Sequence, residues 1–325
     1  MAAAAPLIAG FDAGQTHTSC RLARLAADGQ LQPLADGEGS GVSHLDAPGG
    51  SQRFEGALRA SLAAARAAAG LATDQPLAAA AIGASGIEVG SPVQSRGHQL
   101  AAAALGLSPA ALVLTGDERT ALEGAFAAGP GVLVISGTGC IALGRADDGQ
   151  QHRCGGWGWL LDGAGSALDI GRDGLALSVQ MADGRLADTP LRAALWQAIG
   201  ADSPQQVKAA VVTEGFAPAG FARLAPLVDQ QALAGDADAQ AVIARSAQAL
   251  AAMVAAVAQA LQLEAPAVCG VGGALQHLAG LRLGFSTALQ QRCPGARLCA
   301  PAGDALAGAL ALAAERLQRG ELRPR

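Results

Sequence analysis

The sequence predicts an α/β protein made of two similar halves, on three observations. An apolar run, a short polar loop, a second apolar run and an Asp-Gly turn occupy residues 6–30 and recur at residues 131–150. Asp-Gly between apolar runs is a strong β-hairpin signal. Helical patterns follow each hairpin, and such alternation favours a mixed sheet in each half. The composition, 51% hydrophobic but only 3% aromatic, indicates a helix-rich core of small side chains.

The first half alternates apolar runs with helical patterns. We expect strands at 7–11, 20–25, 78–83 and 111–114, and helices at 53–69, 96–105 and 119–128. Asp117 and Glu118 precede the last of these helices, where acidic residues suit the positive end of the helix dipole.

The second half continues the same plan with more helix. We expect strands at 132–135, 140–144 and 267–270, and helices at 166–181, 189–199, 203–213, 236–263, 275–291 and 305–318. Ser203-Pro204 predicts a cap and first turn, because proline is tolerated at the first helical position.

The basic residues exclude two kinds of nucleotide site. Lys208 is the one lysine in the sequence, and no glycine precedes it. A Walker-A loop needs Gly-Lys, and a protein kinase needs a lysine on its third strand. Any phosphate chemistry must therefore use backbone amides, hydroxyl groups and a metal ion.

Charge and cysteine content limit the classes of binding partner and the cellular compartment that we expect for the protein. The net charge is −5 and the arginines are scattered, which gives no support to nucleic-acid binding. The uncharged stretch 246–263 is interrupted by glutamines and predicts a buried helix rather than a membrane span. The first eleven residues lack a basic start for a signal peptide, and the six cysteines form no CxxC pair. We expect a cytoplasmic protein with reduced thiols.

Two glycine loops are candidate phosphate sites. Residues 14–18 and 137–139 each follow an apolar strand, and a third glycine cluster lies at 270–273. Glycines let the backbone approach a ligand, while amides and threonine hydroxyls bind anionic oxygens. A plain hairpin turn explains either loop alone, but their recurrence favours two loops that bind a polyphosphate between them.

Two aspartates end predicted strands, where an α/β sheet forms its ligand crevice. Asp12 and Asp117 are each placed to hold Mg²⁺ or to accept a proton from an attacking hydroxyl. The alternative for each is a local capping role.

A tryptophan-glycine segment is the third candidate region. Trp157 and Trp159 lie among glycines, which would expose an indole face to a sugar or a base; the alternative is that both are core residues. Ser166 follows as a hydroxyl donor or helix cap.

Six short motifs occur in an order that resembles the N-acetylglucosamine kinase and BadF/BadG ATPase-like group of the actin/hexokinase/Hsp70-like superfamily. They are Phe11–Thr18, Ala84–Gly86, Gly116-Asp117, Ile135–Cys140, Gly155–Gly158 and Gly270–Gly273. The resemblance implies two similar ribonuclease H-like (actin-like ATPase) domains with mixed five-stranded sheets flanked by helices and a cleft between them. It implies domains at 1–115, joined by a C-terminal helix at about 303–325, and at 116–302.

The resemblance also implies roles for individual residues in an ATP-dependent hexosamine kinase that forms a homodimer. Asp117 would be the general base for the sugar 6-hydroxyl, and Asp12 would position Mg²⁺. The implied ATP contacts are Asp12, Gly14, Thr16, Thr18, Gly137, Thr138, Gly139, Gly272 and Gly273. The implied sugar contacts are Ser85, Gly156, Trp157, Asp162 and Ser166, with Thr138 also on the sugar side.

Departures from the group leave the sugar and two alternatives open. Gly163-Ala164 occupies the place of an Asp-Glu pair, and no asparagine lies near Ser43-His44. Such losses change which hydroxyls a site recognises, so N-acetylglucosamine and glucosamine both stay candidates. The alternatives are an ATPase that energises an iron–sulfur reductase, with Cys293 and Cys299 as the close cysteine pair, and a sugar-sensing regulator without turnover.

Overall fold

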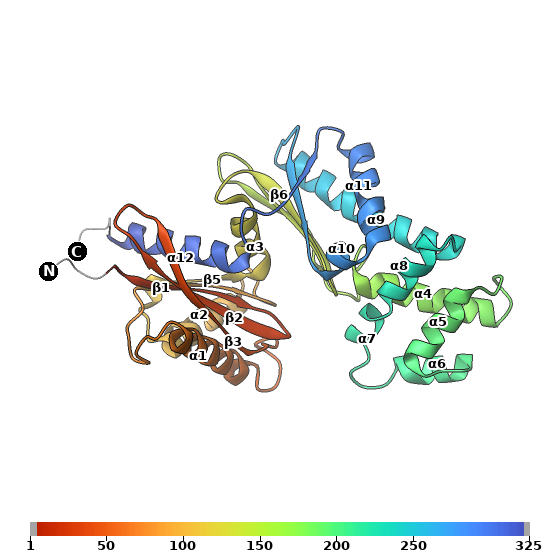
Figure 1. Ribbon diagram of the computed structural model, residues 1–325, viewed down its shortest axis with the longest axis horizontal. Coiled ribbons are helices and arrows are strands. Elements are labelled where there is room, and N and C mark those ends of the chain that lie inside the picture. Colours follow the sequence, from red (N-terminus) through yellow and green to blue (C-terminus); the bar gives the residue numbers. More distant parts are fainter. Residues whose placement is uncertain (1–4, 322–325) are drawn as a thin grey trace. The chain divides into compact units, whose positions relative to one another are not determined.

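The computed structural model describes residues 5–321 and divides them into two compact units, each with its own sheet (Figure 1). Unit 1 runs to Ala128 and resumes at Pro301, whereas unit 2 comprises Gly129–Ala300. The two ends of the described chain therefore belong to the same unit.

Unit 1 contains a five-stranded sheet in the order β3-β2-β1-β4-β5. Its strands are β1 (Leu7–Ala13), β2 (His17–Leu25), β3 (Leu31–Ser40), β4 (Ala79–Ala84) and β5 (Leu112–Gly116). The first three form an antiparallel meander, and β4 and β5 extend it in parallel with β1. The helices are α1 (Gly50–Ala68), α2 (Pro92–Leu105), α3 (Asp117–Phe126) and α12 (Ala305–Glu321), with a 3₁₀ turn at Pro109–Ala111.

Strand alternation divides the core of unit 1 between the two faces of the sheet. Ile8 lies on one face in a cluster with Leu310 of α12. Phe11 lies in a second cluster with Phe54 of α1. Gly10 allows α12 to approach closely, because a Cβ there would lie 2.8 Å from the Leu310 backbone nitrogen.

Unit 2 repeats this topology with the strand order β10-β9-β6-β7-β8. The strands are β6 (Gly131–Ser136), β7 (Cys140–Arg145), β8 (Gln151–Gly155), β9 (Ala267–Val271) and β10 (Arg297–Cys299). As in unit 1, the first three form an antiparallel meander, and β9 and β10 continue the sheet in parallel. The internal repeat predicted from the two hairpins is therefore present.

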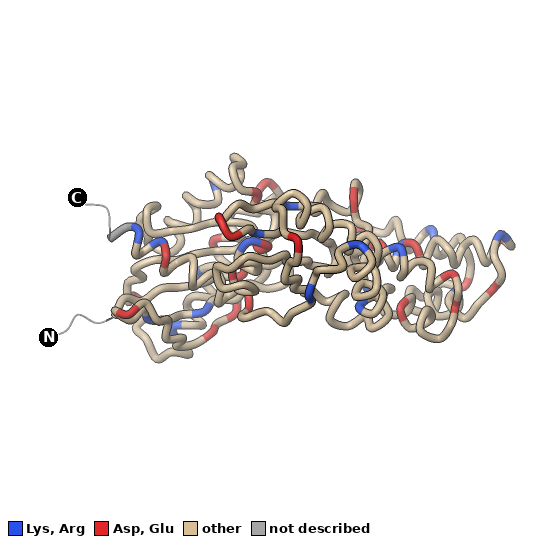
Figure 2. The backbone as a smooth tube through the Cα atoms, turned by 90° about the horizontal axis from the view of Figure 1, so that it is seen from above, with Lys and Arg blue, Asp and Glu red and all other residues tan. Residues whose placement is uncertain are grey.

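Helices form the larger part of unit 2. They are α4 (Ala167–Ala182), α5 (Pro190–Ile199), α6 (Pro204–Val211), α7 (Ala219–Ala222), α8 (Ala225–Leu233), α9 (Ala237–Ala260), α10 (Gly273–His277) and α11 (Ala279–Arg292). Helix α9 has the length and apolarity of a membrane span, but 56% of its apolar window is buried, as is typical of a core helix. Figure 2 shows acidic and basic residues interspersed along the described backbone, in line with the scattered arginines of the sequence.

Three strands were absent from the sequence-based expectation: β3, β8 and β10. Strand β3 contains Pro33 and mostly polar or small residues, and it lies at an edge of its sheet, where proline is tolerated. Strand β10 is an edge strand of three exposed residues. The first hairpin loop is also shorter than expected, because Asp12 belongs to β1 and Thr18 to β2.

The division between the units falls later than the expected boundary after residue 115, so α3 belongs to unit 1. The reason is its close contact with the returning chain. The Gly303 amide donates to the Gly124 carbonyl over 2.9 Å. A Cβ on Gly124 would overlap the carbonyl oxygen of Asp304, so glycine is required for this contact.

Candidate active site

Three polar residues meet where the parallel strands of unit 1 end. Asp12 pairs in register with Gly83 of β4, and Ala84 pairs with Gly116 of β5. Ser85 follows β4 directly, and its amide donates to the Ala13 carbonyl over 3.0 Å. Asp117 follows β5 as the first residue of α3. Because parallel strands end at the same edge, this edge carries two carboxyl groups and a hydroxyl group.

The Asp12 carboxyl is half-buried and unusually difficult to ionise. Its pKa is raised to about 6: burial is the main cause, the negative charges of Asp117 and Asp304 add to it, and His17 opposes the shift. A buried carboxylate with other carboxylates around it is stabilised by a cation. This electrostatic setting suits a residue that helps to bind Mg²⁺.

Asp117 is held at the start of α3 by its local backbone. Burial raises the pKa of its carboxyl group, and hydrogen bonds from the Glu118 amide and with the Glu118 side chain oppose this. The Thr120 hydroxyl donates to the Asp117 carbonyl over 3.0 Å. The Thr120 side chain also fills the space next to Gly83, where a Cβ would overlap the Thr120 hydroxyl. Asp117 therefore combines a raised carboxyl pKa with a backbone that is held in place at the start of α3.

The tip of the β1–β2 hairpin presents backbone and exposed side chains. The Gly14 amide donates to the His17 carbonyl over 3.0 Å, and the Val42 amide donates to the Gly14 carbonyl over 2.9 Å. Thr16 is exposed at this tip. The Gln15 and Thr16 side chains are therefore accessible to a ligand, whereas both backbone groups of Gly14 are used within the fold.

Thr18 is a correction to the sequence-based site. It pairs with Ala13 and is fully buried, whereas Asp12 pairs with Ser19. Cross-strand partners share a face and neighbours along a strand do not, so the Thr18 hydroxyl lies on the opposite face from Asp12. Ser19, which the sequence reading missed, carries the hydroxyl on the Asp12 face. The period-two alternation of β2 is the signal that would have identified it.

A further carboxylate, Asp304, belongs to this edge of unit 1. It accepts hydrogen bonds from Arg21 Nη1 over 2.9 Å and from the Ala307 amide over 2.8 Å. The same Arg21 guanidinium binds Asp36 on the neighbouring strand. Arg21 thus links β2 and β3 to the start of α12, and Asp304 lies close enough to affect the Asp12 pKa.

In unit 2, three loops meet at the end of β6. The Gly137 amide donates to the Gly139 carbonyl over 2.8 Å, which closes the hairpin between β6 and β7. The Ser136 hydroxyl donates to the Gly165 carbonyl over 2.6 Å. The loop before α4 is therefore fastened to the glycine loop. Gly272 completes the group, because a Cβ there would overlap the Ser136 carbonyl oxygen.

Gly137, Gly139 and Gly273 differ from Gly272 in having free space around them. A Cβ would meet nothing within 4 Å at Gly137 and Gly139, and at Gly273 it would meet only His277, at 3.9 Å. Their backbones lie outside the left-handed region, whereas Gly272 has a φ of 95°. Internal packing does not require glycine at these three positions, but the close approach of a ligand to the backbone would. Thr138 is exposed between two of them.

The loop before α4 holds two of the sugar-side candidates, Asp162 and Ser166. Ser166 is buried and caps α4: its hydroxyl donates to the Gly163 carbonyl over 2.7 Å and accepts from the Asp169 amide. Its hydroxyl is therefore already used within the fold. Asp162 lies near two thiols, since its charge adds to the burial that raises the pKa of Cys140 to about 12 and also raises that of Cys154.

Trp157 has an exposed indole, so the expectation that its face is accessible fits the structure better than a core position. Its side chain is 60% exposed and follows Gly156 at the end of β8. The Arg153 guanidinium carbon lies 5.1 Å from the centre of the indole ring. Arg153 was not identified from the sequence, because the turn that brings it onto Trp157 is a backbone feature.

Comparisons with known proteins show the family to which the chain belongs. The sequence profile of the BadF/BadG/BcrA/BcrD ATPase family matches residues 9–313. The chain belongs to this family. An N-acetylmuramic acid/N-acetylglucosamine kinase from Clostridium acetobutylicum is 26% identical over 204 residues, which are 62% of this chain and 67% of that protein.

Solved structures extend the likeness to the fold. A Chromobacterium violaceum protein, provisionally assigned as an N-acetylglucosamine kinase, is 32% identical with a TM-score of 0.72, covering 97% of this chain and 99% of that one. A ROK family glucokinase from Streptomyces griseus, solved with glucose and AMPPNP, is 18% identical with a TM-score of 0.57, covering 97% and 100%. The predicted actin-like architecture of two mixed five-stranded sheets flanked by helices is thus confirmed.

Among residues 5–321, no group of three or more His, Cys, Asp or Glu side chains is arranged to hold a metal. A cation at Asp12 would take its other ligands from phosphate oxygens and water, as Mg²⁺ does in nucleotide sites.

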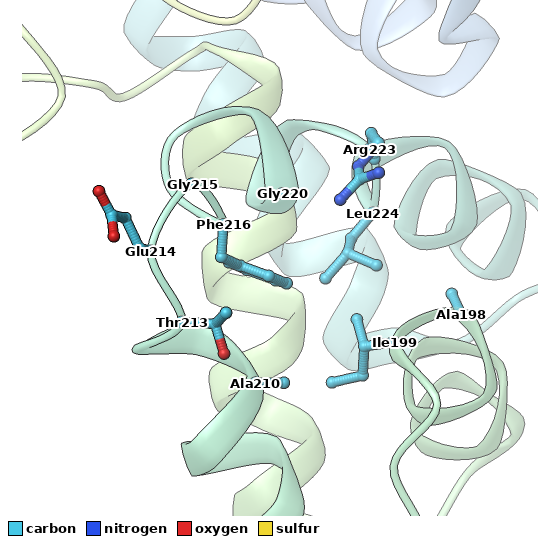
Figure 3. Close-up of a pocket in the computed structure, with 10 residues that line it drawn as sticks. All are labelled: Ala198, Ile199, Ala210, Thr213, Glu214, Gly215, Phe216, Gly220, Arg223 and Leu224. Carbon is cyan, nitrogen blue, oxygen red and sulfur yellow. The ribbon is translucent and has the colours of Figure 1, made fainter.

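A cavity of about 500 Å³ lies elsewhere, among the helices of unit 2 (Figure 3). The Phe216 ring projects toward Ile199 and Leu224, and the Glu214 carboxylate points away from them. None of the candidate site residues lines this cavity. It therefore does not contribute to the site described above.

Proposed function

We propose that this protein is an ATP-dependent sugar kinase that transfers the γ-phosphate of ATP to the 6-hydroxyl of a hexosamine, N-acetylglucosamine or glucosamine. The observation that carries the proposal is the placement of Asp12 and Asp117 at the ends of β1 and β5, two parallel strands on either side of β4 in one sheet. The names of the relatives support the reaction class.

In this proposal Asp117 accepts the proton of the 6-hydroxyl as the oxygen attacks phosphorus. Its raised pKa makes it a stronger base than an ordinary aspartate. Asp12 helps to bind Mg²⁺, which neutralises charge on the transferring phosphoryl group. The Gly14–Thr16 and Gly137–Gly139 segments bind phosphate oxygens, and Gly272 and Gly273 face the adenosine.

On the sugar side, Ser85, Gly156, Trp157 and Asp162 are the proposed contacts. Ser166 acts through the loop before α4, because its hydroxyl is occupied within the fold. Gly163 and Ala164 offer no side-chain hydrogen bonds, so the choice among hexosamines depends on the remaining groups.

The test is an ADP-release assay with ATP, Mg²⁺ and a panel of N-acetylglucosamine, glucosamine, N-acetylmuramic acid, N-acetylmannosamine and glucose. Phosphorus NMR of the product would identify the phosphorylated oxygen. We expect sugar-dependent ADP release and a 6-phosphate. ADP release that needs no sugar would favour the ATPase alternative, and no release with any sugar would favour the regulator.

We further propose a cytoplasmic homodimer. All six cysteines are free and show no pairing, which suits a reducing compartment. Light scattering coupled to size-exclusion chromatography would measure the molar mass, and a value near 32 kDa rather than twice that would contradict the dimer.

A further inference from the structure

Trp157 lies in the segment Gly155–Gly165, whose two ends are both fixed next to the glycine loop of unit 2. At one end, Gly155 pairs in register with Ile141 of β7, two residues after Gly139. At the other end, the Gly165 carbonyl accepts the Ser136 hydroxyl. The exposed indole is therefore tethered close to the loop proposed to bind phosphate.

Arg153 supports this indole through three contacts. Its Nε donates to the Gly155 carbonyl over 3.2 Å, and its Nη2 donates to the Gly156 carbonyl over 2.7 Å. Its guanidinium also lies over the Trp157 ring, 5.1 Å from the ring centre. One side chain thus holds both the turn and the ring that follows it.

The turn is built to accept this arginine. Gly155 and Gly156 have φ values of 77° and 75°, a left-handed conformation that favours glycine. A Cβ on Gly156 would lie 2.9 Å from Arg153 Nη2 and 2.8 Å from Ile141 Cδ1. A larger residue at Gly156 would require the Ile141 side chain or the Arg153 guanidinium to move.

We infer that Arg153 is a positioning residue that holds the Trp157 indole as a fixed platform for the apolar C–H face of the sugar ring. The inference rests on the proposed kinase function. Aromatic rings present a large rigid apolar surface, and a guanidinium over the ring face is attracted to it. An indole that is already ordered loses little conformational entropy when the sugar binds.

The chain contains a matched control pair. The Arg192 guanidinium lies 5.0 Å from the centre of the Trp196 ring. Trp196, however, is only 5% exposed and donates from Nε1 to Ser178 Oγ inside the core of unit 2. This second pair has the same interaction without an accessible ring face.

The experiment combines kinetics with a double-mutant cycle. We expect Arg153→Ala to raise the KM for the sugar about fivefold, the size expected for a cation–π contact of about 1 kcal/mol, and to leave the KM for ATP unchanged. Arg153→Lys should restore part of the loss. In a Trp157→Ala background, Arg153→Ala should have no further effect on the sugar KM. Arg192→Ala should leave it unchanged.

Tryptophan fluorescence gives a readout that does not depend on turnover. The Trp157 signal is isolated by subtracting the emission of a Trp157→Phe variant, and it should become more sensitive to acrylamide quenching in Arg153→Ala. Unchanged quenching, or a sugar KM equal to that of wild type, would overturn the inference. If wild type phosphorylates no sugar in the panel, the proposed function fails and the sugar platform fails with it. The quenching result would still decide whether Arg153 orders Trp157.

Discussion

The Asp117 carboxylate raises the pKa of the Asp12 carboxyl group. Asp12 is on β1 and Asp117 follows β5, at the same end of the sheet and on either side of β4. Burial makes the larger contribution, and together the two effects bring the Asp12 pKa to about 6. Without a cation, the folded protein therefore holds two carboxyl groups in a setting that disfavours their joint ionisation.

Replacing Asp12 with Asn should stabilise the fold at neutral pH. The Asp12 pKa lies above its value of 3.8 in an unfolded chain, so the folded state binds a proton more tightly between pH 4 and 6. Wild type should thus gain thermal stability as the pH falls from 7.5 through 6, because folding takes up a proton in that window. The variant should lack this contribution.

Thermal unfolding of both proteins at pH 7.5, 6 and 5 would measure the effect. We expect the variant to have the higher Tm at pH 7.5 and the difference to shrink at pH 5. Parallel pH profiles for the two proteins would show that Asp12 is not the titrating group. The affinity of wild type for Mg²⁺ with ATP should also fall below about pH 6, since the protonated carboxyl group cannot act as an anionic ligand.

Asp117→Asn should abolish most turnover and leave nucleotide binding intact. Loss of a general base typically lowers a rate by about a hundredfold or more, and the amide keeps the shape of the side chain. Steady-state kinetics would give kcat, and calorimetry would give the Kd for ATP. Asp74→Asn, at an exposed position far along the chain from this edge, serves as the control. Near-normal kcat in Asp117→Asn would exclude the proposed base.

Two glycine substitutions in unit 2 should have opposite consequences. Gly139→Ala places a methyl group in open space, so we expect a normal Tm and a KM for ATP raised about tenfold, as the methyl group obstructs the phosphate. Gly272→Ala should lower the Tm, because its Cβ would overlap the Ser136 carbonyl in a left-handed backbone. Gly56→Ala, whose Cβ also meets open space, is the control and should change neither the KM for ATP nor the KM for the sugar.

The fold was predictable from sequence to the extent that its signals were local. The two hairpins and the helices after them follow from apolar runs and Asp-Gly turns. The edge strands β3 and β10 were not predicted, because polar or very short strands lack the alternation of apolar and polar residues that a buried face imposes. Asp12 and Asp117 were identifiable because each ends an apolar strand. Asp304 was not, since its proximity to Asp12 depends on a return of the chain from nearly three hundred residues away.

Asp304→Ala should weaken the attachment of α12. The substitution removes the acceptor of the Ala307 amide at the start of the helix, and such caps contribute about 1 kcal/mol. It also leaves Arg21 with only Asp36, a smaller loss because this ion pair is largely exposed. Chemical denaturation would measure the change. Asp28→Ala, at the exposed turn between β2 and β3, is the comparison and should lower the free energy of unfolding less.

Helix α12 imposes an order on biosynthesis. It supplies Ala309, Leu310 and Ala313 to the cluster that covers Ile8 and Ala81, on strands made more than two hundred residues earlier. While the ribosome is still synthesising unit 2, that apolar face of the unit 1 sheet has no cover. Unit 2 can therefore complete its core first, and unit 1 becomes complete only when the last helix has emerged. A chain that stops shortly before α12 would leave one face of the unit 1 sheet uncovered, even though every proposed catalytic residue had been made.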